Sequence, residues 1–267
     1  MSSLFSYIRI VCVLLTITAC GGGGDGGSNN VPNANASFAG IWSGETVSSI
    51  SGQRIKVNGI ALKTGEVLFF AYQDGHVFSG SWKNSTGGLS ITANAQWKDY
   101  MLGAQESFPI GWVSSAAFAK LEQTFTATGP YSERQTAALA YTASLGDAGA
   151  VNLSFWTVYD RASTLAKLAG TYSNGPNLAV TINSDGTFSG TDIASSGFSN
   201  VTRHYSGRFS LIDPAKNIYG LQISVDGSLF NGYAFIVDSA VGKTDDAIQL
   251  AATQSSWGPF VHYWKKQ

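Results

Sequence analysis

The chain has 267 residues, of which 44% are hydrophobic, 12% aromatic and 12% charged. Its 16 Lys and Arg residues nearly balance its 17 Asp and Glu residues, which leaves a formal net charge of −1 at pH 7. A chain so close to neutral offers no basic surface to nucleic acid, and its length and aromatic content are enough for one or two hydrophobic cores.

The N-terminus has the pattern of an export signal. Arg9 is the only charged side chain before Cys20, and residues 10–17 are apolar apart from Thr16. This apolar run is too short to cross a bilayer, which takes about 20 residues, but it is typical of a secretory signal. We therefore expect residues 1–19 to be a signal peptide.

The signal ends in Ile17-Thr18-Ala19-Cys20. These four residues resemble the lipobox of Gram-negative bacterial lipoproteins, in which signal peptidase cuts before the cysteine and the thiol carries lipid. The resemblance implies cleavage between Ala19 and Cys20, acylation of Cys20 with lipid such as palmitate, and attachment of the protein to a bilayer. An ordinary signal peptide that contains a cysteine is the alternative. Gly21, rather than Asp, follows the cysteine, which by the sorting rule of such lipoproteins implies the outer membrane and leaves the periplasmic or cell-surface face open.

Residues 20–37 predict a flexible tether, because a stretch rich in glycine and asparagine has almost nothing to bury. Three of its glycines match the spacing G-x-G-x-x-G, but they follow a cleavage site and no strand, so that no dinucleotide cofactor is expected. A glycine tract behind a lipidated cysteine also resembles surface lipoproteins of pathogenic Gram-negative bacteria, such as transferrin-binding and factor H-binding proteins. Those proteins end in eight-stranded barrels and bind host proteins.

Alternation of apolar and polar residues dominates the rest of the chain. It is unbroken through residues 89–97 and 219–225, and the second run ends at Asp226-Gly227, a hairpin dipeptide. In a similar run at residues 178–182, Leu178, Val180 and Ile182 share one face, and Tyr233, Phe235 and Val237 form another such face. The pattern predicts half-buried antiparallel strands joined by tight turns.

Two segments of the chain resemble each other, which indicates a duplication. FAGIWSGE at residues 38–45 returns as LAGTYSNG at residues 168–175, and each copy is followed by a strand and a glycine turn. The register of the repeat stays open, since the turn that corresponds to Gly186 is Gly65 in one pairing and Asp74-Gly75 in another. In the first pairing one copy carries an insertion.

One helix is expected between the two copies, within residues 159–170, where Asp160 or Ser163 can cap its start and Gly170 can end it. We therefore predict an all-β fold with two tandem antiparallel up-and-down barrel-like units of about eight strands each. The first unit is residues 38–159, and the second, residues 160–267, begins with the short helix. The opening of the second unit resembles avidin- and lipocalin-type barrels, which implies this architecture and no particular ligand.

Residues that carry catalysis are sparse. His76, His204 and His262 lack the spacing of metal ligands, no G-x-S-x-G motif is present, and Asp245-Asp246 has the pattern of a turn. We expect no enzyme activity, no metal and no cofactor. A glycan hydrolase of the envelope is a less favoured alternative, because glycosidase carboxylates lie far apart in sequence.

Residues 98–120 form the longest stretch without alternation, interrupted by two glycines and a proline. A long irregular segment in a barrel is often a binding loop, and Phe108, Ile110 and Trp112 are its candidate contact residues. The alternative is that these side chains hold the segment against the end of the barrel.

Together these patterns predict a membrane-anchored envelope lipoprotein that acts as a non-catalytic binding or structural module, with an unknown protein as the expected partner. The alternative function is a carrier of a small hydrophobic ligand of the lipocalin or avidin type. Such a carrier needs an open barrel, and an interior filled by the side chains of Trp97, Tyr219, Leu221 and Ile223 would argue against it.

Overall fold

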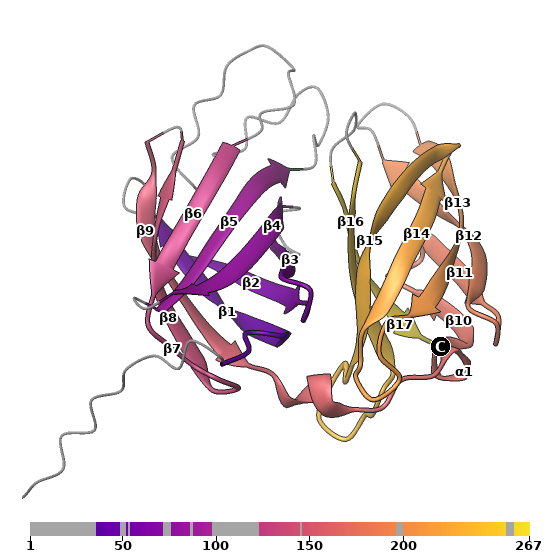
Figure 1. Cartoon of the computed structure of the whole chain (residues 1–267). Coiled ribbons are helices and arrows are strands. Elements are labelled where there is room, and N and C mark those ends of the chain that lie inside the picture. The colour runs from indigo at the N-terminus through magenta and orange to yellow at the C-terminus, as the bar shows by residue number, and fades with distance from the viewer. Residues whose placement is uncertain are drawn as a thin grey trace, which may run out of the picture. The chain divides into compact units, whose positions relative to one another are not determined.

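The computed structural model describes residues 36–48, 52, 54–71, 76–85, 88–97, 123–144, 146–195, 200–254 and 259–267. These residues form two closed antiparallel barrels with very little helix (Figure 1). The prediction of an all-β fold with two eight-stranded units in tandem is confirmed. Both barrels belong to one compact unit, residues 32–267.

The first barrel closes with eight strands. They are β1 (Gly40–Ser48), β2 (Arg54–Ala61), β3 (Glu66–Ala71), β4 (His76–Ser85), β5 (Gly88–Trp97), β6 (Gln123–Gly129), β8 (Thr136–Ala143) and β9 (Ala148–Phe155). Each strand pairs with the next, β6 pairs with β8, and β9 returns to β1. The two-residue strand β7 (Tyr131–Ser132) pairs with the start of β8.

The second barrel is a simple meander whose last strand pairs with its first. Its strands are β10 (Gly170–Ser173), β11 (Leu178–Ile182), β12 (Thr187–Ser195), β13 (Asn200–Leu211), β14 (Tyr219–Val225), β15 (Ser228–Val237), β16 (Ala247–Thr253) and β17 (Phe260–Lys266). Among the described strands, closure leaves neither barrel with an open sheet edge, which removes the main route to strand-by-strand aggregation.

The connection between the barrels contains the 3-10 turn η1 (Thr157–Asp160) and the four-residue helix α1 (Leu165–Leu168). The expected caps were wrong, because the hydroxyl of Thr164 accepts the N–H of Lys167 at 3.3 Å. Ser163 is buried and donates its hydroxyl to the carbonyl oxygen of Asp213 instead. Leu168 is buried in the core of the second barrel, and Leu165 packs against that core.

The glycine turns decide the register of the repeat. The N–H of Gly65 donates to the carbonyl of Leu62 at 3.0 Å, and the N–H of Gly186 donates to that of Asn183 at the same distance. Both glycines have positive φ angles, +95° and +85°, so Gly65 corresponds to Gly186. The insertion in the first copy lengthens the hairpin of β1 and β2, which have nine and eight residues, whereas β10 and β11 have four and five.

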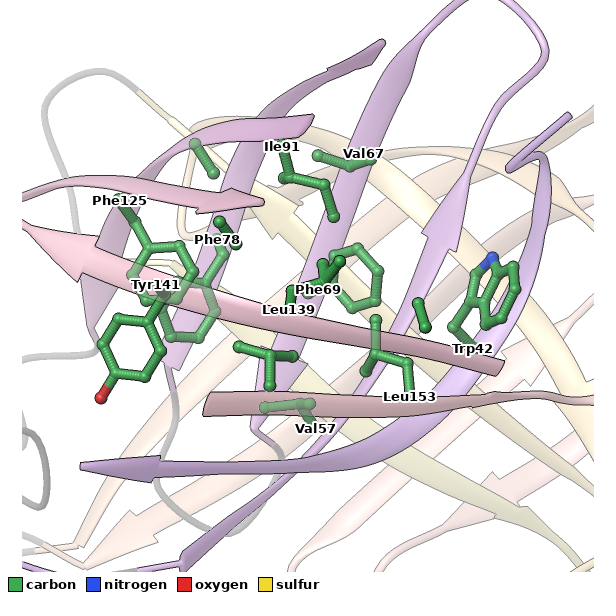
Figure 2. Packing of buried hydrophobic residues seen from close by; sticks show 14 of the residues in the cluster. Trp42, Val57, Val67, Phe69, Phe78, Ile91, Phe125, Leu139, Tyr141 and Leu153 are labelled. Carbon is green, nitrogen blue, oxygen red and sulfur yellow. The ribbon is translucent and has the colours of Figure 1, made fainter. Parts of the chain in front are cut away.

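Side chains fill both barrels. Figure 2 shows aromatic and aliphatic side chains from all eight strands of the first barrel pointing toward one another. In β5 the expected inward face of Leu89, Ile91, Ala93 and Ala95 is confirmed. The second core is built in the same way around the fully buried Trp264. An eight-stranded barrel is just wide enough for its own side chains, which explains the dense interior.

A third apolar cluster joins the two barrels, and we call it the seam. Tyr233, Phe235 and Val237 point out of the second barrel, with Phe235 against Phe70 of the first barrel at 6.1 Å between ring centroids. The buried seam residues are Ile41, Ile60, Leu62, Leu68, Phe70, Val77, Val158, Tyr159, Ile218, Phe235, Val237, Ala247, Ala251 and Val261. The seam therefore makes the two barrels one packed body.

Polar contacts reinforce the seam. Asn58 donates from Nδ2 to Oε1 of Gln249 at 2.8 Å, from one barrel to the other. The buried Asn217 donates to the carbonyl of Ile236 at 2.7 Å and accepts the N–H of the same residue at 3.0 Å. Its own N–H donates to the carbonyl of Tyr159, which ties the connection to the second barrel.

Candidate functional site

The predicted anchor and the predicted binding loop lie outside the described residues. This holds for Ala19 and Cys20 at the cleavage site, and for Phe108, Ile110 and Trp112 in residues 98–120. Both stay predictions.

The histidines do not form one site. His76 is buried in β4 of the first barrel, whereas His204 is exposed on the outside of β13 and His262 lies on β17. The described part of the chain holds no group of three or more His, Cys, Asp or Glu that could bind a metal ion. Several carboxylates instead pair with cations, as Asp238 and Asp245 do with Arg161 at 2.7 Å each.

The interior of the second barrel is occupied where a carried ligand would sit. Tyr219, Leu221 and Ile223 are buried in its core, as the sequence predicts for a filled barrel. The side chain of Trp97 in the first barrel lies outside the described residues. A ligand held inside the second barrel would have to displace packed aromatic and aliphatic side chains, which is costly in a close-packed core.

A groove of about 920 Å³ lies on the outer surface, beside the seam. We call it the groove. Its walls come from β3 and β4 of the first barrel, from the outer face of β12 to β16 of the second, and from Leu165 of α1. The polar residues that line it are Glu66, Ser79, Asp185, Thr187, Arg208, Ser210, Gln222, Asn231, Tyr233 and Thr253.

Strand register places five of these side chains in one line, which we call the polar row. Thr187 is opposite Arg208, which is opposite Gln222, and the line continues through Asn231 to Thr253. Residues directly opposite each other on neighbouring strands share a face of the sheet, so one polar side chain from each of five consecutive strands faces the groove.

A second line runs beside the polar row and contains Ser210, Gly220 and Tyr233. The space beside Gly220 is taken by the side chain of Ser210, because a Cβ on Gly220 would come within 2.6 Å of Oγ of Ser210. The hydroxyl of Tyr233 donates to Oε2 of Glu66 in the first barrel at 3.3 Å. Burial, together with the nearby Glu66, raises the pKa of Tyr233 to about 12, so the phenol keeps its proton at neutral pH.

Few charges face the groove. Arg208 is exposed and forms no ion pair with any residue that the structure describes. Asp185, at the rim, accepts both the hydroxyl and the N–H of Thr187, and these hydrogen bonds lower its pKa. Among the described residues, the side-chain amides of Gln222 and Asn231 hydrogen-bond only to each other, at 3.4 Å, so both keep donors and acceptors available.

No family model matches the chain. Comparisons with curated proteins and with solved structures also find no match. Among the described residues, no helix is long and apolar enough to cross a bilayer.

Sequence reasoning missed the groove. Alternation marks Arg208, Gln222 and Asn231 as residues on the polar faces of their strands. Their alignment depends on the register of four strand pairs and on the position of the first barrel, which no local pattern encodes.

Proposed function

We propose that this protein is a lipid-anchored envelope protein whose two fused barrels act as a non-catalytic binding module. The observation that carries the binding half of the proposal is the groove, a hollow of mixed polar and apolar lining on the outer surface of a protein whose barrels have packed cores. Binding sites are commonly concave and lie where two folded units meet.

The anchor rests on the lipobox-like residues before Cys20 and on the tract behind it. A tether formed by residues 20–37 has a reach of about 20–25 Å if it behaves as a flexible chain. It would hold the barrels close to the outer membrane and leave them free to turn toward a ligand.

Two other candidate sites have different support. Binding of a small hydrophobic ligand inside a barrel has less support than binding in the groove, because Tyr219 and its neighbours occupy the core of the second barrel. A protein partner at residues 98–120 has support from sequence alone, through Phe108, Ile110 and Trp112.

The two cysteines of the chain provide a matched test of the anchor. In Cys20→Ala we expect the full chain to leave the membrane fraction and to lose incorporation of labelled palmitate, because the acylated thiol is gone. Cys12→Ala lies within the signal and should change neither result. Retention of Cys20→Ala in washed membranes, or palmitate label on that variant, would contradict the anchor.

A further inference from the structure

We propose that the groove binds a polysaccharide chain that carries few charged groups. This rests on the proposed function, since it names the ligand class of the binding module. The argument combines the chemistry of the lining side chains, their spacing, and the kinds of ligand that the groove does not suit.

The polar row has the chemistry that sugar hydroxyls require. The amides of Gln222 and Asn231 and the hydroxyl of Thr253 can both donate and accept hydrogen bonds, as a sugar hydroxyl does. The hydroxyl of Thr187 donates to Asp185 and accepts from Asn183, which leaves it one further lone pair as an acceptor. Ser79 adds a further hydroxyl from the first barrel. Such groups can satisfy a dense array of hydroxyls without bringing charge into the site.

Tyr233 provides a flat apolar surface beside this array. Its ring is half-buried and lines the groove, and on the neighbouring strand it is opposite Gly220, which has no side chain. The C–H face of a pyranose packs well against an aromatic ring, while the hydroxyls at its edge reach the polar side chains around it. Because its hydroxyl is bonded to Glu66, the ring is held in place before a ligand arrives.

The spacing of the row suits a repeating chain. Adjacent strands lie about 4.8 Å apart, so the five side chains offer a polar group at regular intervals over about 19 Å. The length of one sugar residue along a linear polysaccharide is of the same order as this spacing between adjacent strands. A chain that lies along the row from Thr187 to Thr253 would therefore meet a donor or acceptor at each sugar.

Other ligand classes fit less well. A peptide strand cannot extend these sheets, because both barrels are closed and the strands that the structure describes present no free edge. An anionic polymer would need several cations, and the groove is lined by Arg208 but by no other cationic residue among those described. Apolar side chains also line the groove: Val67, Phe209 and Leu221 belong to the barrel cores, whereas Leu165 is half-buried and Leu211 is exposed, so the lining is a mixed one.

The test uses the purified full chain in detergent and isothermal titration calorimetry with defined hexasaccharides. The uncharged probes are the β-1,4-linked hexamers of N-acetylglucosamine and of glucose and the α-1,4-linked hexamer of glucose; the charged probe is hexagalacturonate. We expect at least one uncharged hexamer to bind and Gln222→Ala/Asn231→Ala to weaken it by about tenfold or more, since two hydrogen-bonding amides are lost.

A matched double variant controls for removal of surface amides. Gln135 and Asn152 are exposed in the first barrel and do not line the groove. Gln135→Ala/Asn152→Ala should therefore bind like the wild type, and both double variants should keep the wild-type melting temperature because all four side chains are exposed or partly exposed.

Three results would overturn the inference. These are binding of none of the uncharged hexamers, equal binding by both double variants, and binding of hexagalacturonate alone through Arg208. None of them bears on the behaviour of Cys20→Ala, so failure of this ligand class is distinguishable from failure of the anchor.

Discussion

The indole Nε1 of Trp42 donates a hydrogen bond to the carbonyl oxygen of Phe38 at 2.9 Å, four residues earlier. The second barrel repeats this contact, since the hydroxyl of Tyr172 donates to the carbonyl oxygen of Leu168 at 2.8 Å. Both aromatic side chains are buried, and each lies in the first strand of its barrel, which pairs with the last. The repeated sequence pattern thus fixes the chain where it enters each closed barrel.

Removal of one of these hydrogen bonds should destabilise the protein. Tyr172→Phe keeps the ring and leaves the carbonyl of Leu168 without this donor, so we expect the free energy of unfolding to fall by about 1–2 kcal/mol. Urea denaturation followed by tryptophan fluorescence measures the change. Thr171→Ala, on the exposed face of the same strand, is the control, and an equal effect of the two variants would contradict the role of the hydroxyl.

The two equivalent glycine turns should respond differently to alanine. Gly65 and Gly186 share positive φ, which costs alanine about 1 kcal/mol in either turn. A Cβ on Gly186 would also come within 2.9 Å of the carbonyl oxygen of Phe209, whereas one on Gly65 would come only within 3.4 Å of that of Trp82. Gly186→Ala should therefore lower the melting temperature more than Gly65→Ala, and the reverse order would contradict this packing.

The seam should contribute to the stability of the protein in the same way as a hydrophobic core does. Phe235 is fully buried between Phe70 and Trp156, so Phe235→Ala should cost about 3–5 kcal/mol, and Phe235→Leu clearly less because it leaves a smaller cavity. Urea denaturation of both variants measures the loss. A cost below about 1 kcal/mol for the alanine variant would show that the barrels do not pack through this residue.

The acid limb of the stability profile should depend on Asp238. Hydrogen bonds from Arg161, and also from the N–H of Asp245, lower the pKa of Asp238 from 3.8 to about 2. The unfolded chain then binds this proton more readily than the folded one. The stabilisation is therefore complete above the ordinary pKa and is lost as the pH falls through about 2.

Asp238→Asn should flatten that limb. We expect the urea midpoint of the wild type to fall more steeply between about pH 4 and pH 2 than that of the variant, by a modest amount because Asp238 is partly exposed and solvent screens the pair. Arg161→Gln should have a similar effect, since it removes the partner. If the urea midpoints of the wild type and both variants fell in parallel with pH, the pair of Asp238 and Arg161 would not be the cause of the acid dependence.

Local patterns in the sequence determined the strands, their inward faces and the duplication. Alternation at residues 219–225 predicts Tyr219, Leu221 and Ile223 in the core because the side chains of a strand alternate between its two faces. Positive φ at Gly65 and Gly186 follows from the same turn chemistry in both copies. These features depend on neighbours in the chain, which is why they could be predicted.

Only the tertiary structure decided what the outer faces do. Phe235 and Arg208 both lie on outward faces, yet one is buried in the seam and the other lines the groove, because the first barrel covers part of the second and leaves the rest open. The polar row likewise depends on the register of distant strands. Alternation separates the two faces of a strand, but the partner that covers the outer face comes from far along the chain, and no local pattern specifies it.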